Sequence, residues 1–186
     1  MTAQASEKLV IENEMYHLFN EPLEGYLKEK NIKFTALNSA CWRGYFGAWE
    51  LKNNELHLID FKGFINNEEV DLSFLFPQAS SVKAEWFTGR LKIPVGEMIQ
   101  YIHAGFNSIY PAGLRIEIEE GNISKIILEK YHYKQTTEMN PLFEEEETTF
   151  EIIHTETTEV TWSKMIEILT DDNSATSYGI AAMCNF

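Results

Sequence analysis

Apolar and polar residues alternate over several short stretches of this chain, which is the pattern of β-strands with one buried face. The strictest alternation is Leu-Arg-Ile-Glu-Ile-Glu at 114–119. Strand-like stretches also occur in pairs around a few turn-forming residues such as Asn53 and Asn54, and asparagine tolerates the positive φ that tight hairpins need. The predicted hairpins are 8–11 with 15–19, 45–51 with 56–61, and 114–119 with 123–133.

Helical periodicity is confined to two short stretches. Trp162, Met165, Ile166 and Leu169 recur at the spacing of one helix face, which predicts a short amphipathic helix. Pro22 fits the first turn of another short helix, because its missing N–H costs nothing there. The remaining apolar stretches are predicted strands at 82–93 and 149–154, a strand or a helical turn at 70–76, and a helix or a strand at 96–103.

Together these elements predict a mainly β protein of the α+β class: one domain with a mostly antiparallel sheet, barrel or sandwich and two or three short helices. A chain of 186 residues with 44% hydrophobic and 13% aromatic residues is large enough for one folded core. We expect residues 1–133 to form the antiparallel β core. Residues 134–186 would add a polar loop over 134–147, a strand and the amphipathic helix to the same domain.

Charge changes this picture, because the formal net charge is −14 and it is unevenly distributed. Residues 1–133 carry 18 acidic and 13 basic side chains, whereas residues 134–186 carry 11 acidic and two basic ones. Such a chain is not expected to bind nucleic acid by neutralising phosphates. An acidic surface speeds the encounter with a basic protein partner, although it also serves solubility alone.

Targeting signals and cysteine usage indicate a cytoplasmic protein. The first residues contain no apolar segment of the kind found in signal peptides, and no apolar run is long enough to cross a bilayer, so no membrane partner is expected. Cys41 and Cys184 are too far apart in sequence to form a disulfide framework, which fits a reducing compartment.

The densest group of contact-making side chains is the stretch 38–51, which contains Trp42-Arg43-Gly44-Tyr45. Arg43 has two interpretations: a structural guanidinium stacked on Trp42 or Tyr45 and paired with a carboxylate, or a clamp for an anionic ligand. We favour the structural interpretation. Cys41 is more often a small buried apolar residue than a nucleophile when no partner histidine is evident.

A glycine- and aromatic-rich loop at 104–113 is the second candidate region, because binding residues concentrate on loops held by a scaffold. His103, which leads into it, is the histidine with the best claim to a chemical role. The four consecutive glutamates are interpreted as a solvated face, with a weak cation site as the alternative. The full set of predicted binding residues is Trp42, Arg43, Tyr45, Trp49, Trp86, Arg90, Tyr101, His103, Phe106, Tyr110, Glu144, Glu145, Glu146 and Glu147.

No sequence motif for a nucleotide-binding loop, a dinucleotide fold, a zinc protease, a redox pair of cysteines or a hydrolase nucleophile occurs in the chain. We therefore predict no cofactor, no metal site and no catalytic residue.

One resemblance emerges from the order of these motifs. The chain resembles a family of uncharacterised bacterial proteins over roughly 8–131, and the resemblance implies no catalytic residues. The Gly47-Ala48-Trp49 triplet also resembles the Gly-x-Trp of lipocalin-like barrels. The stretches that carry the family resemblance are Pro22 to Tyr26, Trp42 to Tyr45, Trp49 to Leu51, Leu56 to Leu58, Trp86 to Pro94, Gly96 to Met98 and Tyr101 to Phe106.

Three functional hypotheses follow, in decreasing order of preference. The first is an acidic inhibitor or immunity-type protein that neutralises a basic protein such as a toxin, with aromatic and arginine side chains as anchors. The second is a β-barrel that binds a small ligand among Trp42, Tyr45, Trp49, Trp86 and Tyr101, with Arg43 holding an anionic group. The third is a hydrolase-type enzyme that uses Arg43, Glu50 and His103, which requires the three side chains to meet in one cleft.

Overall fold

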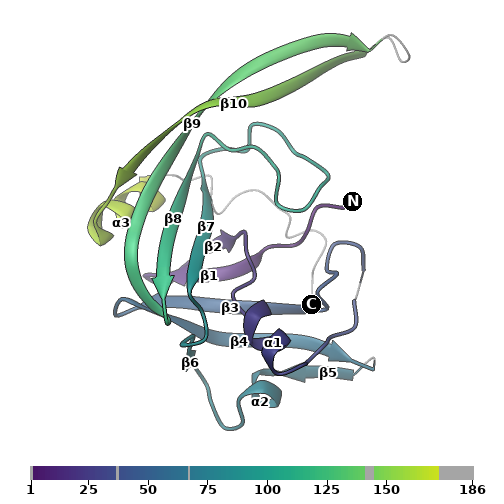
Figure 1. Ribbon diagram of the computed structural model, residues 1–186, viewed down its shortest axis with the longest axis vertical. Coiled ribbons are helices and arrows are strands. Elements are labelled where there is room, and N and C mark those ends of the chain that lie inside the picture. The colour runs from purple at the N-terminus through teal and green to yellow at the C-terminus, as the bar shows by residue number, and fades with distance from the viewer. Residues whose placement is uncertain (1, 37, 67, 141–144, 172–186) are drawn as a thin grey trace.

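The computed structural model describes residues 2–36, 38–66, 68–140 and 145–171, which form a single α+β domain built on one mixed sheet (Figure 1). Its main strand order is β2-β1-β3-β4-β9-β8-β7, while β10 pairs with β9, and β5 and β6 pair with β4. The elements are β1 (Glu7–Ile11), β2 (Glu14–Leu18), α1 (Glu24–Glu29), β3 (Tyr45–Lys52), β4 (Glu55–Ile65), β5 (Glu68–Asp71), α2 (Leu72–Leu75), β6 (Val82–Lys83), β7 (Gly89–Val95), β8 (Ala112–Glu119), β9 (Asn122–Asn140), β10 (Glu145–Glu159) and α3 (Trp162–Asp171).

The three predicted hairpins are confirmed as β1–β2, β3–β4 and β8–β9. Asn53 and Asn54 both have positive φ, as a tight hairpin turn requires. All strand pairs are antiparallel except β1 with β3, which run in parallel with Leu9 opposite Trp49. The β1–β2 hairpin therefore extends the sheet through its first strand, and β1 becomes an interior strand.

The sheet curls so that its two outer strands approach each other. Just beyond β2, the Phe19 N–H donates to the carbonyl of Lys92 on β7, at an N to O distance of 2.9 Å. The Asn20 amide then bridges the carbonyl of Arg90 and the N–H of Lys92. Pro94 lies on β7 at the sheet edge, where a proline removes no ladder hydrogen bond.

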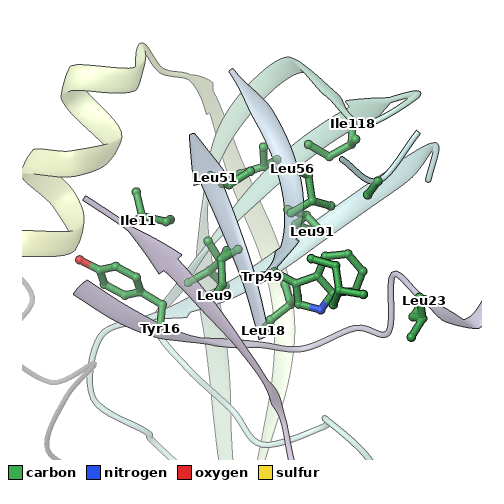
Figure 2. Packing of buried hydrophobic residues seen from close by; sticks show 14 of the residues in the cluster. Leu9, Ile11, Tyr16, Leu18, Leu23, Trp49, Leu51, Leu56, Leu91 and Ile118 are labelled. Carbon is green, nitrogen blue, oxygen red and sulfur yellow. The ribbon is translucent and has the colours of Figure 1, made fainter. Parts of the chain in front are cut away.

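The hydrophobic core fills the concave side of the curled sheet. Trp49 is completely buried, and it belongs to one core cluster with Leu9, Leu51, Leu56 and Leu91, which come from β1, β3, β4 and β7 (Figure 2). The predicted alternation of β3 is confirmed, because its residues from Tyr45 to Leu51 are alternately buried and half-buried. This packing occupies the space that a barrel-type ligand site would need.

The short helices cover the ends of this core. The predicted C-terminal helix is confirmed as α3, which buries Met165 and Leu169, and the indole of Trp162 donates to the Glu12 carboxylate. The predicted helix near Pro22 is confirmed as α1, with Leu27 buried, but Pro22 precedes the N-cap Leu23 and does not lie in the first turn. None of the described helices is long and apolar enough to cross a membrane.

Four local predictions need revision. The stretch 70–76 holds the end of β5 followed by α2, so both of its predicted conformations occur in succession. The stretch 96–103 is neither helix nor strand, and is held by an isolated bridge between Gln100 and Ile109. The predicted strand at 82–93 divides into β6 and β7 around an irregular segment. The fourth revision concerns the acidic region.

The prediction of a solvated loop over 134–147 is wrong for most of its length. Residues up to Asn140 continue β9, and residues from Glu145 onward form β10, so the region is a long antiparallel ribbon. We call residues 131–140 and 145–155 the arm, which extends away from the sheet in Figure 1. The prediction failed because the arm buries neither face fully, so its sequence lacks the apolar alternation by which strands are recognised.

Candidate functional site

The aromatic motif at the entrance of β3 turns its side chains in opposite directions. Trp42 is 64% exposed, whereas only 6% of the side-chain surface of its neighbour Arg43 is exposed. The turn depends on Gly44, which has φ +73°, and whose missing Cβ would lie 2.4 Å from the Thr35 carbonyl oxygen. The motif therefore presents one ring to the surface and sends one cation into the protein.

The buried Arg43 side chain lies beside two acidic side chains. Its Nε lies 3.5 Å from Oε1 of Glu7 and its Nη1 lies 3.4 Å from Oε1 of Glu21. The guanidinium also stacks 5.6 Å from the ring centre of Tyr45 and 5.2 Å from that of Phe46. The structural interpretation of Arg43 is confirmed, with Tyr45 rather than Trp42 as the stacking partner.

Glu7 is the one charged residue of the described chain that is fully buried, and sequence reasoning did not identify it. The Trp49 indole donates to its Oε2 at 2.5 Å, and the Gly47 N–H donates to the same carboxylate. A Cβ on Gly47 would lie 2.9 Å from that oxygen and from the Trp49 Nε1, so only glycine leaves room for the contact. Glu7 thus fixes β1 against β3.

Burial dominates the electrostatics of this cluster. Loss of hydration raises the pKa of Glu7 to about 8, although Arg43 and the Trp49 hydrogen bond act in the opposite direction. Burial together with the Glu7 charge also raises the pKa of Tyr45 far above its usual range. Four buried polar atoms here lack a hydrogen-bond partner within the protein: Glu7 Oε1, Arg43 Nε, Arg43 Nη2 and Tyr45 OH.

The rings of the proposed ligand pocket do not surround a common cavity. Tyr45 and Trp49 are packed in the core, while Trp42 and Tyr101 are largely exposed. Trp86 packs on Trp49, with ring centres 6.5 Å apart, and also on Tyr26 and Phe76. A surface pocket of about 400 Å³ lies elsewhere, lined by Glu69, Val70, Asp71, Ser73 and Phe74. The packing therefore gives the small-ligand hypothesis no site among the predicted rings.

The three residues of the enzyme hypothesis are engaged separately. Arg43 contacts Glu7 and Glu21, Glu50 lies opposite His57 on the neighbouring strand, and His103 is hydrogen-bonded to the Tyr101 hydroxyl at 3.2 Å. Cys41 is fully buried, and its thiol donates to the Tyr45 carbonyl, which fits a structural residue. The described geometry therefore does not bring Arg43, Glu50 and His103 together in one cleft.

The predicted loop is joined through Gln4 to the segment that carries Trp42. Gln4 connects the two segments: its side chain accepts from the Trp42 N–H, while its backbone N–H donates to the carbonyl of Gly105. Tyr101 is 53% exposed. Phe106 and Tyr110 turn inward and stack on Phe19, at ring-centre distances of 5.4 and 5.8 Å. The structure thus brings Trp42, Tyr101 and His103 onto connected loops.

The arm contacts these same loops. The Tyr133 hydroxyl donates to the Tyr110 carbonyl at 2.7 Å, and the Gln100 amide donates to the Thr148 carbonyl at 3.0 Å. Of the eight large apolar side chains that are exposed in the described residues, six belong to the arm or to these loops. We call these six the arm–loop surface: Trp42, Ile99, Tyr101, Met139, Ile152 and Ile153.

The remaining predicted site residues do not join this surface as a group. Arg90 is exposed on β7 opposite Glu117. Glu144 lies outside the described residues, while Glu145 to Glu147 form the first part of β10. In the described part of the chain, no cluster of histidine, cysteine or acidic side chains fits a metal ion. Sequence reasoning also missed Ile152 and Ile153, whose adjacent apolar side chains in a strand of glutamates and threonines were the available signal.

A comparison with protein-family models, curated proteins and solved structures finds no match to the chain. The resemblance to a bacterial family therefore stays a prediction.

Proposed function

We propose that this protein is a protein-binding module of the inhibitor or immunity type, and that its arm–loop surface binds a basic protein partner such as a toxin. The observation that carries the proposal is the concentration of exposed apolar side chains on the arm and the loops beside it. Isolated exposed apolar residues need no explanation, but a group of them on connected segments is typical of interaction sites.

The chemistry of the surface resembles that of interface hot spots. Trp42 and Tyr101 are large rings with few rotatable bonds, so little conformational entropy is lost when a partner immobilises them. Loops and an N-terminal segment that are hydrogen-bonded to each other hold both rings. Such preorganisation supports binding, because the surface does not need to be ordered when the partner arrives.

The charge of the arm supports a basic partner. β10 contains six glutamates and neither lysine nor arginine. A basic protein is drawn to such a strand over distances of about 8–10 Å at physiological salt, and its association is faster at low ionic strength. An acidic partner or a nucleic acid would be repelled by the same charges.

A capture experiment with matched variants tests the proposal. The wild-type chain, an Ile152→Ser/Ile153→Ser variant and a Phe74→Ser control would be immobilised and exposed to lysate of the native host at low salt. Phe74 is 47% exposed but lies on α2, at the opposite end of the molecule from the arm (Figure 1). We expect the wild type and the control to retain a basic protein that the double variant loses.

The captured protein would then be purified and its own activity measured with each variant. Losing two buried isoleucine side chains from an interface should weaken binding by at least about tenfold, since each contributes roughly 1.5–3 kcal/mol when fully buried. Inhibition should weaken in parallel. Retention of the same proteins by all three chains, or the absence of any basic protein, would show that the arm–loop surface is not the binding site.

A further inference from the structure

The outer edge of β10 has no neighbouring strand among the described residues. β10 pairs with β9 along its length, from Glu145 opposite Asn140 to Glu159 opposite Ile127, and with no other described strand. A strand edge presents a row of backbone donors and acceptors, which another chain can use by adding a strand. The edge of β10 is therefore a candidate docking element in its own right.

The burial pattern shows that the ribbon is incomplete. From Glu151 to Glu159 every residue of β10 is exposed except Thr155, which is half-buried, so neither face is covered. From Glu145 to Thr155 the ribbon has two strands only, because β8 pairs with β9 no further than Lys130, and two strands alone are marginally stable in water. The arm gains from a third strand both in backbone hydrogen bonds and in coverage of Ile152 and Ile153.

A β-bulge divides the edge into two unequal parts. The register shifts between Ile152 and His154, which leaves Ile153 as the extra residue, and bulges discourage pairing where they occur. In the part of β10 that precedes the bulge, the Gln100 side-chain amide already donates a hydrogen bond to the Thr148 carbonyl. We call residues 154–159 the docking strip. It is the best supported part of β10, because most of it pairs with β9 residues that also pair with β8 in the main sheet.

Charge decides which strand fits the docking strip. A second copy of this chain would place the glutamates of one β10 against those of the other, and like charges in facing strands are destabilising. A lysine- or arginine-rich strand would meet Glu156 and Glu159 with opposite charge. Lys125 already shows this pairing, at 3.0 Å from Glu159.

We propose that a basic, extended segment of the partner adds to the docking strip as a new edge strand, so that the local sheet order becomes β8-β9-β10-partner. This inference rests on the proposed function and specifies how the partner is recognised. Ile152 and Ile153, which directly precede the strip, would be covered by apolar side chains of the same segment. Backbone pairing would supply affinity, and the glutamates would select a basic sequence.

A pair of synthetic peptides separates backbone pairing from charge attraction. The first alternates lysine with valine and threonine over the length of β10. The second has the same sequence and charge but carries N-methyl groups on alternate backbone nitrogens, so that it lacks the donors of one edge. Binding to the full chain would be followed by nuclear magnetic resonance and by hydrogen exchange of the amides in residues 154–159.

We expect the first peptide to bind and to slow the exchange of amides in the docking strip, while the N-methylated peptide binds at least about tenfold more weakly, because several hydrogen bonds are lost at once. Equal binding of both peptides without new protection would overturn strand addition and leave the proposed function standing. No binding of either peptide would also overturn it, whereas the proposed function fails only when the capture experiment finds no basic partner.

Discussion

Replacing Glu7 by glutamine should remove a large pH dependence from the stability of this protein. The folded state raises the pKa of Glu7 to about 8 from an ordinary value of 4.5, because the carboxyl loses its hydration when β1 packs on β3. The folded protein thus binds this proton more tightly than the unfolded chain does. The contribution to stability is fully present below pH 4.5, is lost progressively as the pH rises, and is gone above about pH 8.

The size of the effect follows from the difference between the two pKa values. One pKa unit corresponds to about 1.4 kcal/mol, so the full loss between the two limits is about 5 kcal/mol, most of it before neutral pH. This is a large part of the free energy of unfolding of an ordinary domain, which is about 5–15 kcal/mol. A glutamine at this position stays neutral, and its amide oxygen still accepts the indole hydrogen bond of Trp49.

Denaturant unfolding of the wild type and of the Glu7→Gln variant, measured at intervals from pH 5 to pH 9, provides the assay. Other carboxylates titrate in both proteins, so the difference between the two free energies isolates Glu7. We expect the free energy of unfolding of the variant, relative to that of the wild type, to increase by several kcal/mol as the pH rises across this range. A Glu97→Gln variant is the control, because that side chain is exposed.

Curves that stay parallel from pH 5 to pH 9 would refute this reasoning. They would mean that Glu7 is already ionised at pH 5, held by Arg43, the Gly47 N–H and the Trp49 indole. The indole signal of Trp49 in nuclear magnetic resonance gives an independent check, since its hydrogen-bond acceptor changes charge. That signal should titrate near pH 8 in the wild type and not at all in the variant.

Three further perturbations test the packing around this cluster. Gly44→Ala should lower the free energy of unfolding by roughly 1–3 kcal/mol or more, because the added methyl group meets the Thr35 carbonyl at a positive φ; chemical denaturation measures it. Arg43→Met should move the titration of Glu7 to still higher pH, because the guanidinium is the main charge that lowers its pKa, and an unchanged midpoint would contradict the pairing. Met165→Ala should cost about 2–5 kcal/mol, since this fully buried side chain holds α3 on the sheet, and a smaller loss would show that the helix packs loosely.

The parts of the fold that were predictable from sequence are those where one face of a strand is buried. Residues 45–51 alternate because Tyr45 and Trp49 point into the core, and Asn53 and Asn54 carry their own conformational signal in the turn. The arm buries neither face fully, so its apolar residues indicated only the strand at 149–154, which is confirmed as part of β10, and the rest of 134–147 was predicted as a loop. Its evidence lay in threonine, which favours strands and occurs repeatedly on both sides of the arm.

The candidate site was predictable only in part, because its key contacts join distant residues. Trp42, Tyr101 and His103 were identified from local density of aromatic side chains. The partner of Arg43 was predicted to be a carboxylate, but nothing in the sequence selects Glu7 from the other acidic residues. That choice depends on the parallel pairing of β1 with β3, and the alternation of a strand does not reveal which strand lies beside it.

The interior position of β1 has a practical consequence for anyone who shortens this chain. Residues 7–11 come early in the sequence, where trimming is usually harmless, yet they lie between β2 and β3 in the sheet. Deleting them would expose one side of the Trp49 indole and remove the Glu7 carboxyl group from beside the Arg43 guanidinium. Affinity tags and truncations are therefore better placed away from this segment, because its removal opens the middle of the protein.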